Sequence, residues 1–251
     1  MNSAKDLRIA PISAQDARKI VSSLHYSGKT VQNSQIHLGV FLNGKCGGAM
    51  QFGPSMDKRR TQGLVRGTLW HEFIELNRMA FADWLPRNSE SRSLGFAMRW
   101  LRKTYSHLKW VISFADATQC GDGTIYRASG FNLTGIKVNK TILRLPDGTI
   151  VADKTLNDDP VKNTRFWKAR GAAPLKGFQL RYVYFLDPSY RDRLTVPMIP
   201  FDRIDELGAS MYRGQPRAGS ADSGTAAVQV AGGGAIPTPA LPTTFEANHG
   251  A

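Results

Sequence analysis

The sequence predicts an α/β protein in which helices flank one mixed β-sheet. Its 251 residues, 41% of them hydrophobic, are enough to bury a large core. Short apolar runs typical of strands alternate with segments whose apolar residues recur at helical spacing. One such run, Trp110 to Asp116, ends in a carboxylate and is followed by a glycine-containing loop and a short helical segment. Because open α/β sheets bind ligands at strand ends of this kind, this stretch is the first candidate site.

The chain begins with a predicted strand and helix. Residues 7–12 form an apolar run, and Ser13 follows at a position typical of a helix cap. The apolar residues after Ser13 recur at helical spacing, and Gly28 provides a stop signal. We therefore expect an amphipathic helix that ends near His25.

A β-hairpin is expected next. Two apolar runs, residues 36–42 and 45–52, flank the pair Asn43-Gly44. This pair is typical of hairpin turns, because both residues tolerate a positive φ. Inside the second arm, Gly47-Gly48 predicts a bulge or a close backbone approach.

The middle of the chain supplies the core of the predicted sheet. Residues 54–67 are polar and basic, and we expect a mobile loop there. A long strand is predicted over 70–81, and a helix with one apolar stripe over 86–105. The strand that ends at Asp116 follows, and then a short helix over 124–129.

The pattern weakens in the last third of the chain. Apolar segments at 141–145 and 149–152 flank a Pro-Asp-Gly turn and predict a second hairpin. Residues 163–170 are basic and partly helical in pattern, and 179–186 predict a strong strand. From residue 214 onward Gly, Ala, Pro, Ser and Thr dominate, which indicates a disordered tail.

The charge balance points to a polyanionic partner. The chain has 33 Lys and Arg against 20 Asp and Glu, a net charge of +13. The tail from residue 214 holds one basic and two acidic residues, so the excess lies in the folded part. Nucleic acid or an anionic membrane surface would be attracted, and a basic protein that is merely soluble is the alternative.

Several classes of protein are excluded. Two cysteines, Cys46 and Cys120, do not make a disulfide framework, and a reducing cytoplasm is expected. Cys120 has no histidine beside it in sequence, so a bystander thiol is favoured over a nucleophile. No run approaches the roughly 18 apolar residues of a membrane span, and no membrane partner is expected.

Asp116 and Tyr126 are the leading candidates for chemistry. Asp116 could act as a general base or an oxygen ligand of a metal, or it could cap local backbone N–H groups. The Tyr126 phenol could protonate a leaving group or bind an anion, or it could pack against the sheet as an ordinary core aromatic. Position alone leaves both pairs of alternatives open.

Other polar residues are weaker candidates. His25 and Tyr26 lie at a helix end, where His25 could be a base or a ligand or could interact with the last carbonyls. Arg87 and Arg92 flank a helix start whose free N–H groups attract phosphate. Two further charged residues, Glu75 and Arg78, are three apart in a strand and are expected to point to opposite faces. One could point into a cleft while the other supports it, or both could be ordinary surface charge.

Taken in order, these elements resemble the GNAT-like acyl-CoA N-acyltransferase fold. In that fold a central strand leads to a pyrophosphate-binding loop and helix, matched here by residues 70–81 and 87–105. A second strand leads to a helix with an aromatic residue that ends in Gly-Phe, matched by 110–115 and by Ile125-Tyr126 with Gly130-Phe131. The loop lacks the glycines of the family pattern.

Six motifs resemble the Mom DNA-modification proteins of Mu-like phages more closely. They are HYSG, GVF…GGAMQFGP, ELNRMAF, RNSESRSL, SFAD and GTIYRASGF, in the same order. The resemblance implies conversion of adenine to N6-(carbamoylmethyl)adenine in phage DNA, which protects that DNA from host restriction in the host cytoplasm. It also implies functional roles for six residues, His25, Tyr26, Arg78, Ser91, Asp116 and Tyr126.

The resemblance further implies roles, cofactors and a domain plan. Asp116, Tyr126, His25 and Tyr26 would act in catalysis, and Arg78, Ser91, Arg87 and Arg92 would hold acetyl-CoA or a related donor. Because acetyl transfer alone does not make a carbamoylmethyl group, we consider an iron ion, with the ligand set His25, Asp116 and Tyr126. The expected domains are a GNAT-like catalytic domain over 1–186, an extension over 187–213 and a disordered tail over 214–251.

The implied partner is double-stranded phage DNA from which adenine is flipped out, because the N6 edge is buried in a duplex. The basic run Lys58-Arg59-Arg60 would grip phosphates, and Trp70, Trp84 and Trp100 could stack on bases, although a core role is favoured for each. The oligomeric state, monomer or homodimer, is left open. Two other functions are considered: an N-acetyltransferase acting on a protein or small amine, and a DNA-binding module without catalysis.

Overall fold

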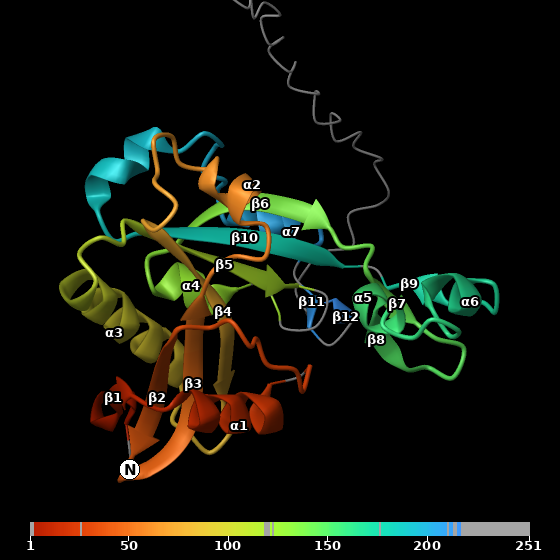
Figure 1. Cartoon of the computed structure of the whole chain (residues 1–251), viewed down its shortest axis with the longest axis horizontal. Coiled ribbons are helices and arrows are strands. Elements are labelled where there is room, and N and C mark those ends of the chain that lie inside the picture. Colours follow the sequence, from red (N-terminus) through yellow and green to blue (C-terminus); the bar gives the residue numbers. More distant parts are fainter. Residues whose placement is uncertain are drawn as a thin grey trace, which may run out of the picture. The chain divides into compact units, whose positions relative to one another are not determined.

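A seven-stranded mixed sheet forms the centre of the computed structural model (Figure 1). The strand order is β1-β2-β3-β4-β5-β10-β6, and every neighbouring pair is antiparallel except β4 and β5. The strands are β1 (Arg8–Pro11), β2 (Ile36–Leu42), β3 (Lys45–Gly53), β4 (Phe73–Phe81), β5 (Trp110–Asp116), β6 (Asn132–Val138) and β10 (Phe178–Phe185). This arrangement confirms the predicted α/β fold with a mixed sheet.

The structure describes residues 3–25, 27–117, 121, 123–175, 177–209, 211–212 and 215–216. The tail expected to be disordered therefore lies outside the described residues apart from Gln215 and Pro216. The limits of the three expected domains stay a prediction. Within the described residues, no helix is long and apolar enough to cross a membrane.

Helices cover both faces of the sheet. Helix α1 (Ala14–Leu24) packs through Val21 against Ala49 of β3, whereas the next residue, Met50, belongs to the cluster that contains α3 (Ser89–Thr104). Successive strand residues point to opposite faces, so α1 and α3 lie on opposite sides of the sheet. We call these sides the α1 face and the α3 face. Helix α4 (Thr124–Ala128) also lies on the α3 face, where its Tyr126 joins the same cluster as α3.

The sheet opens between its two central strands. Strands β4 and β5 pair only from Phe73 with Trp110 to Glu75 with Ile112. Beyond these residues the two strands run in different directions (Figure 1). The carboxyl ends of β4 and β5, including Asp116, therefore border a gap in the middle of the sheet.

A second cluster covers the α1 face at the paired end of β4 and β5. Trp110 of β5 stacks on Phe73 at 4.7 Å, and both pack with Val65 and Tyr190. Residues 54–67 are not simply a loop, because they contain helix α2 (Lys58–Gln62), capped by the Asp57 side chain. The prediction of a loop missed this helix because five residues are too few to show a helical period.

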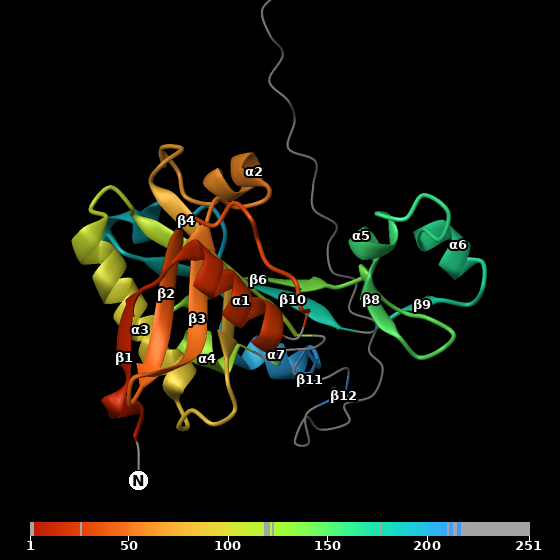
Figure 2. The ribbon, with the colours of Figure 1, turned by 60° about the horizontal axis from the view of Figure 1, so that its bottom comes forward.

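The segment between β6 and β10 forms a small unit with its own core. Its three strands are β7 (Ile142–Arg144), β8 (Ile150–Ala152) and β9 (Ala173–Pro174), and its helices are α5 (Asp153–Leu156) and α6 (Thr164–Lys168) (Figure 2). Leu143, Leu145 and Leu156 form the core of this unit. The predicted second hairpin and the partly helical segment after it are confirmed.

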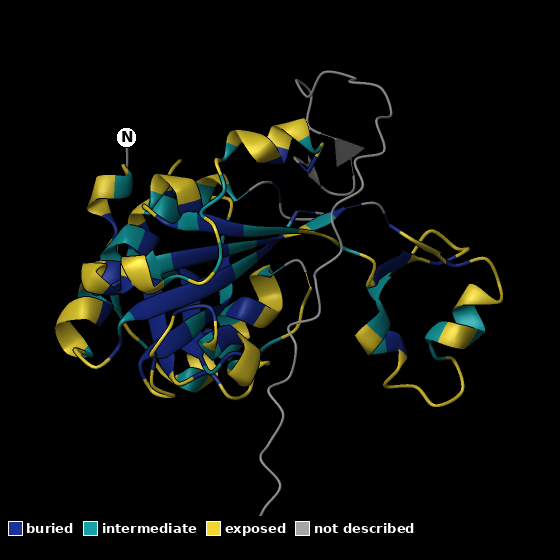
Figure 3. Ribbon diagram, turned by 90° about the horizontal axis from the view of Figure 1, so that it is seen from above, coloured by how far each residue is buried: buried dark blue, intermediate teal, exposed yellow. Residues whose placement is uncertain are grey.

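The remaining elements are short. They are η1 (Ala4–Asp6), η2 (Pro188–Arg193), α7 (Asp202–Glu206), β11 (Met211–Tyr212) and β12 (Gln215–Pro216). Residues after β10 pack back on the domain, since Ile204 and Ala209 join the main cluster. The buried residues are concentrated in the central sheet, with exposed helices around it (Figure 3).

Local signals explain the start of α1 and the bulge inside β3. Ser13 Oγ accepts the Asp16 N–H at 3.0 Å and begins α1, as the capping pattern predicted. The predicted bulge in the hairpin is also confirmed, because Val40 pairs with Gly48 and Phe41 with Cys46, which leaves Gly47 between them. A Cβ at Gly47 would lie 2.6 Å from the Trp84 ring, so the glycine permits this close approach.

Candidate active site

Asp116 lies at the gap in the sheet, on the α1 face. Along β5, Val111 and Ala115 belong to the cluster on the α3 face, whereas Ile112 belongs to the cluster on the α1 face. The same alternation directs Asp116 to the α1 face. Its Oδ1 accepts a long hydrogen bond, 3.4 Å, from Asn139 Nδ2 at the start of the inserted unit. Asp116 is thus a partly buried carboxylate at a strand end, as the sequence predicted.

Tyr126 approaches the same strand from the α3 face. It is 7% exposed, and the Ser113 hydroxyl donates to its phenol oxygen at 2.8 Å. The Tyr126 ring also stacks on Tyr182 of β10 at 4.7 Å. Asp116 and Tyr126 therefore border β5 from opposite faces, and Tyr126 is anchored by packing as well as by its hydroxyl.

His25 caps the C-terminal end of α1, on the α1 face. Its Nδ1 accepts the Ser27 N–H at 3.2 Å and contacts Ser27 Oγ at 2.8 Å. Because a backbone N–H can only donate, Nδ1 is the acceptor and a neutral ring carries its proton on Nε2. Burial, and after it the positive charge of Arg78, lower the pKa of His25 from 6.5 to about 4. His25 is therefore neutral at physiological pH. Its neighbour Tyr26 lies outside the described residues.

Arg78 ties the loop after α1 to strand β4. Its guanidinium donates to the carbonyl oxygens of Asn77 at 2.7 Å and Lys29 at 3.2 Å. Lys29 in turn donates from Nζ to Thr155 of the inserted unit at 2.7 Å. The structure brings Arg78 close to His25 and separates it from the other residues that were expected to hold a donor.

Glu75 points to the same face as Arg78, so the expectation of opposite faces is wrong. Phe52 pairs with Leu76 and Gln51 with Arg78, which leaves Asn77 as an extra residue in β4. This bulge shifts the alternation by one residue. Burial raises the pKa of Glu75, while the Ser55 and Asn77 side chains and the Arg78 charge oppose the rise. A carboxylate with a raised pKa next to the gap is a candidate base.

A cavity of about 350 Å³ lies on the other side of the gap. It is lined by the end of β4, the loop after it, and the first turns of α3 and α4, with Ser91 and Arg87 among its residues. No side chain caps α3, since Asn88 has a positive φ of 68° and makes no capping bond. The Ser89 N–H donates to the Pro86 carbonyl at 3.2 Å, so among the described residues the N–H groups of Glu90 and Ser91 are the ones that remain for an anion at the start of α3, where Arg87 and Arg92 were expected to help.

A second hollow of about 650 Å³ adjoins the first one. Ser91 and Arg87 line both hollows, and Arg92 lines the second, together with Arg99 and Lys5. Among the described residues, none of these four basic side chains is in an ion pair. The second hollow is basic and would suit the anionic part of a donor, whereas Asp83 and Glu90 lie beside Arg87 in the lining of the first one.

Two arginines lie close together on the α1 face without a neutralising carboxylate. Burial, and then the nearby Arg60 charge, lower the pKa of Arg181 of β10. Arg181 is held by Thr134, through Oγ1 at 3.1 Å and the carbonyl oxygen at 2.6 Å. In the described part of the chain neither arginine is in an ion pair. Such a pair favours an anion such as a phosphate.

Comparison with known proteins identifies the family. The model of the Mom protein family matches residues 6–203. The chain belongs to the Mom protein family. It is 36% identical over 200 residues to a protein named methylcarbamoylase mom from Escherichia phage Mu, an alignment that covers 78% of this chain and 82% of the phage Mu protein.

Solved structures that resemble this Mom family member are acetyltransferases. The ribosomal-protein-S18-alanine N-acetyltransferase of Escherichia coli is 13% identical, with a TM-score of 0.43 over 72% of this chain and 94% of that one. The IAA acetyltransferase of Bacillus cereus is 11% identical, with a TM-score of 0.44 over 71% and 99%. A GNAT family acetyltransferase of Elizabethkingia anophelis with acetyl-CoA bound is 14% identical, with a TM-score of 0.41 over 72% and 98%.

The expected iron ligands do not fit a metal site as the structure places them. Tyr126 is packed on the α3 face, whereas His25 and Asp116 lie on the α1 face. Nδ1 of His25 already accepts a hydrogen bond from the Ser27 N–H. Among the residues that the structure describes, no group of three or more His, Cys, Asp or Glu side chains could hold a metal. His25, Asp116 and Tyr126 therefore do not form a shared ligand set for iron in this arrangement.

Two residues of this site, Glu75 and Arg181, were not recognised from the sequence as leading candidates. Glu75 was left open between a cleft residue and ordinary surface charge, because the bulge at Asn77 leaves no signal in the pattern of apolar residues. Arg181 was read only as part of a strong strand, although an arginine between apolar neighbours in a central strand is a usable signal. Cys120, in the loop between Asp116 and Tyr126, lies outside the described residues.

Proposed function

We propose that this protein modifies the N6 amine of adenine in double-stranded phage DNA and makes N6-(carbamoylmethyl)adenine in the host cytoplasm. The product would protect the phage DNA from host restriction. The observation that carries the proposal is the 36% identity over 200 residues with a phage Mu protein named methylcarbamoylase. The net charge of +13 supports DNA as the partner.

The two sides of the gap suit two substrates. On the α1 face, the flipped adenine would meet Asp116, Glu75 and the neutral His25. On the α3 face, the donor would lie in the cavity beside α3, near Ser91 and Arg87. The gap between β4 and β5 would let the two substrates meet without either one crossing the sheet.

A residue on the α1 face would accept the proton that the adenine amine loses. When N6 forms a bond to the CH₂ carbon of a carbamoylmethyl donor, the bond from that carbon to the leaving group breaks and the leaving group keeps the electron pair. N6 loses one hydrogen as a proton, which a carboxylate accepts. Asp116 is the leading base, and Glu75, whose pKa is raised by burial, is the second candidate. His25 would donate a hydrogen bond from Nε2, and Arg78 would position the loop after α1.

The donor would be a molecule related to acetyl-CoA that already carries the carbamoylmethyl group on a leaving group, because acetyl transfer alone would make an amide on N6. Its phosphates would lie at the uncapped start of α3, where Arg87 and Arg92 add positive charge. Ser91 lines the cavity at the first turn of α3. Tyr126 would give its phenol proton to the leaving group from the α3 face.

Mass analysis of nucleosides tests the proposal. Wild-type protein and Asp116→Ala would be produced with plasmid DNA in the same host, and the adenosine masses of the two plasmids compared. We expect a mass increase equal to a carbamoylmethyl group with the wild type and none with the variant. An unmodified plasmid from cells that contain folded wild-type protein would refute the function.

A further inference from the structure

Three large apolar side chains stand exposed around helix α2. Met56 is 78% exposed, Leu69 55% and Trp70 52%. The Lys58 ammonium lies 4.5 Å from the centre of the Trp70 ring and so links the two segments. We call Met56, Lys58, Arg59, Leu69 and Trp70 the α2 surface. The core role favoured for Trp70 from the sequence is wrong.

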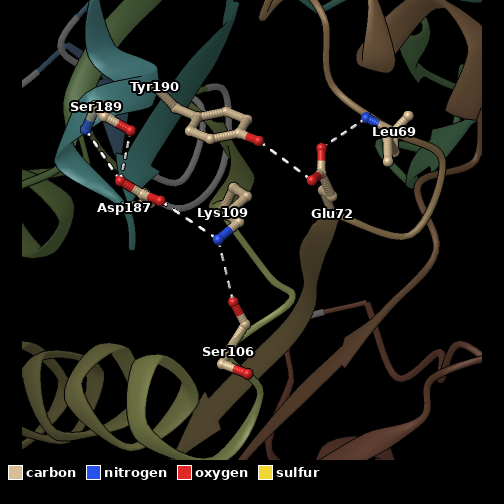
Figure 4. A network of polar contacts seen from close by, with 7 residues as sticks. All are labelled: Leu69, Glu72, Ser106, Lys109, Asp187, Ser189 and Tyr190. Carbon is tan, nitrogen blue, oxygen red and sulfur yellow. Dashed lines mark hydrogen bonds and ion pairs between the residues drawn. The ribbon is translucent and has the colours of Figure 1, made fainter.

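A buried network holds the exposed residues of the α2 surface in place (Figure 4). The Leu69 N–H donates to Glu72 Oε2 at 2.7 Å, and Tyr190 donates from its hydroxyl to Glu72 Oε1 at 3.2 Å. Gln62 at the end of α2 also donates to the Thr68 carbonyl at 2.6 Å. The loop that carries Trp70 is thus fixed from both sides. Trp70 is therefore exposed on a loop that hydrogen bonds hold in place. Large exposed apolar side chains of this kind mark interaction sites.

The charge around the α2 surface selects the class of partner. Residues 54–70 contain four basic residues, Lys58, Arg59, Arg60 and Arg66, and a single acid, Asp57. Asp57 is already engaged, because its carboxylate accepts the Arg60 N–H as the cap of α2. Two copies of this surface would repel each other, whereas a polyanion would be attracted. Nucleic acid therefore fits better than a second copy of the chain.

Helix α2 also connects this surface to the candidate active site. Ser55, just before α2, contacts Thr61 at 3.0 Å, and its side chain is close enough to Glu75 to oppose the rise of that residue's pKa. Arg60 of α2 is near Arg181 of β10. Helix α2, which carries Lys58 and Arg59 of the α2 surface, thus lies near Glu75 and Arg181 on the α1 face, where the adenine would enter.

We propose that the α2 surface binds the DNA duplex beside the adenine site. In this arrangement Trp70 contacts the bases next to the flipped adenine. This inference rests on the proposed function. Flipping removes a base from the stack and leaves apolar base faces exposed, which an aromatic side chain can cover. Lys58, Arg59 and Arg66 then contact the phosphates on either side.

A pair of tryptophan variants tests the proposal. Trp70→Ala removes the proposed contact, and Trp84→Ala is the matched control. Trp84 is 44% exposed and has Lys45 at 4.8 Å from its ring, but it follows β4 near the hairpin. The affinity of each full-length protein for a labelled adenine-containing duplex would be measured by fluorescence anisotropy at one fixed salt concentration. Circular dichroism would confirm that each variant is folded.

We expect Trp70→Ala to weaken duplex binding roughly tenfold, because one stacked base–aromatic contact is lost. Trp70→Phe keeps an aromatic ring and should restore most of the affinity, and Trp84→Ala should bind like the wild type. Equal affinities of Trp70→Ala and Trp84→Ala would overturn the inference. So would a loss of self-association in Trp70→Ala with unchanged DNA affinity, since the surface would then join two copies.

The readout separates this inference from the proposed function. Duplex affinity requires no chemistry, so a selective loss in Trp70→Ala supports the α2 surface even if the wild type leaves adenine unmodified. Conversely, a wild type that modifies adenine while Trp70→Ala binds DNA normally leaves the function standing and removes only the α2 surface.

Discussion

Glu75 and Arg78 point to the same face of the central sheet although they are three residues apart in one strand. Asn77 forms a bulge between them and reverses the alternation of β4. A carboxylate with a raised pKa and the arginine that positions the His25 loop therefore share the α1 face. This placement makes Glu75 a group that can be tested for catalysis and not only for stability.

Glu75→Gln should separate these two roles. The change keeps the shape of the side chain but removes the carboxylate that is the second candidate base. If Glu75 accepts the adenine proton, the rate of adenine modification falls about a hundredfold or more. Stability at neutral pH should not fall, because a buried charge is removed. Single-turnover rates and chemical unfolding measure the two effects, with the exposed Glu206→Gln as control. An unchanged rate would leave Asp116 as the base.

The same variant should change the pH dependence of stability. The folded pKa of Glu75 lies above its ordinary value of 4.5, so the folded state holds this proton more tightly than the unfolded chain does. Its contribution to stability is present below pH 4.5 and is lost as the pH rises through the folded pKa. Glu75→Gln should remove that loss. Unfolding free energies measured across this window would show whether the wild-type and variant curves differ in slope.

His25 gives a prediction of the opposite sign. Its folded pKa of about 4 lies below the ordinary 6.5, so its contribution to stability is present above pH 6.5 and is lost as the pH falls toward 4. NMR titration of the ring should give an apparent pKa near 4. Arg78→Met should raise that pKa, since one cause of the shift is removed, whereas Arg78→Lys keeps the charge. A pKa near 6.5 in the wild type would contradict the burial of the ring.

The sequence predicted the elements better than it predicted their mutual placement. The Asn43-Gly44 turn, the Ser13 cap and the strand that ends at Asp116 depend on local chemistry, and all were predicted correctly. The bulge at Asn77 depends on how β3 pairs with β4, which no local pattern encodes. The exposure of Trp70 could not be predicted either, because it depends on the contact between Glu72 and Tyr190, which are 118 residues apart.

Two glycines with nearly the same backbone angle should respond differently to substitution. Gly123 has φ +71° and Gly67 has φ +70°, so an alanine at either position is strained by about 1–2 kcal/mol. At Gly67 a Cβ meets nothing within 4 Å, whereas at Gly123 it would lie 2.5 Å from the Tyr182 hydroxyl. Tyr182 is fully buried and stacked on Tyr126, so it has little room to move.

We therefore expect Gly123→Ala to lower the free energy of unfolding by about 1–3 kcal/mol more than Gly67→Ala does. Parallel urea titrations of the two variants measure this difference. Equal losses would mean that the start of α4 can shift away from Tyr182, and the pocket wall formed by α4 would then be less rigid than the contacts indicate.

Tyr126 and Ser113 allow the role of the phenol to be separated from its contribution to packing. Tyr126→Phe and Ser113→Ala both remove the hydrogen bond of 2.8 Å between the two hydroxyls, so each should lower the free energy of unfolding by about 1 kcal/mol. Only Tyr126→Phe also removes the proton that the leaving group would receive. Its rate of adenine modification should fall about a hundredfold, whereas Ser113→Ala should lose far less. The rates of both variants would be compared at equal donor and DNA concentrations. If the two variants lost the same activity, the hydrogen bond and not the phenol proton would be what the reaction needs, and Tyr126 would be a positioning residue.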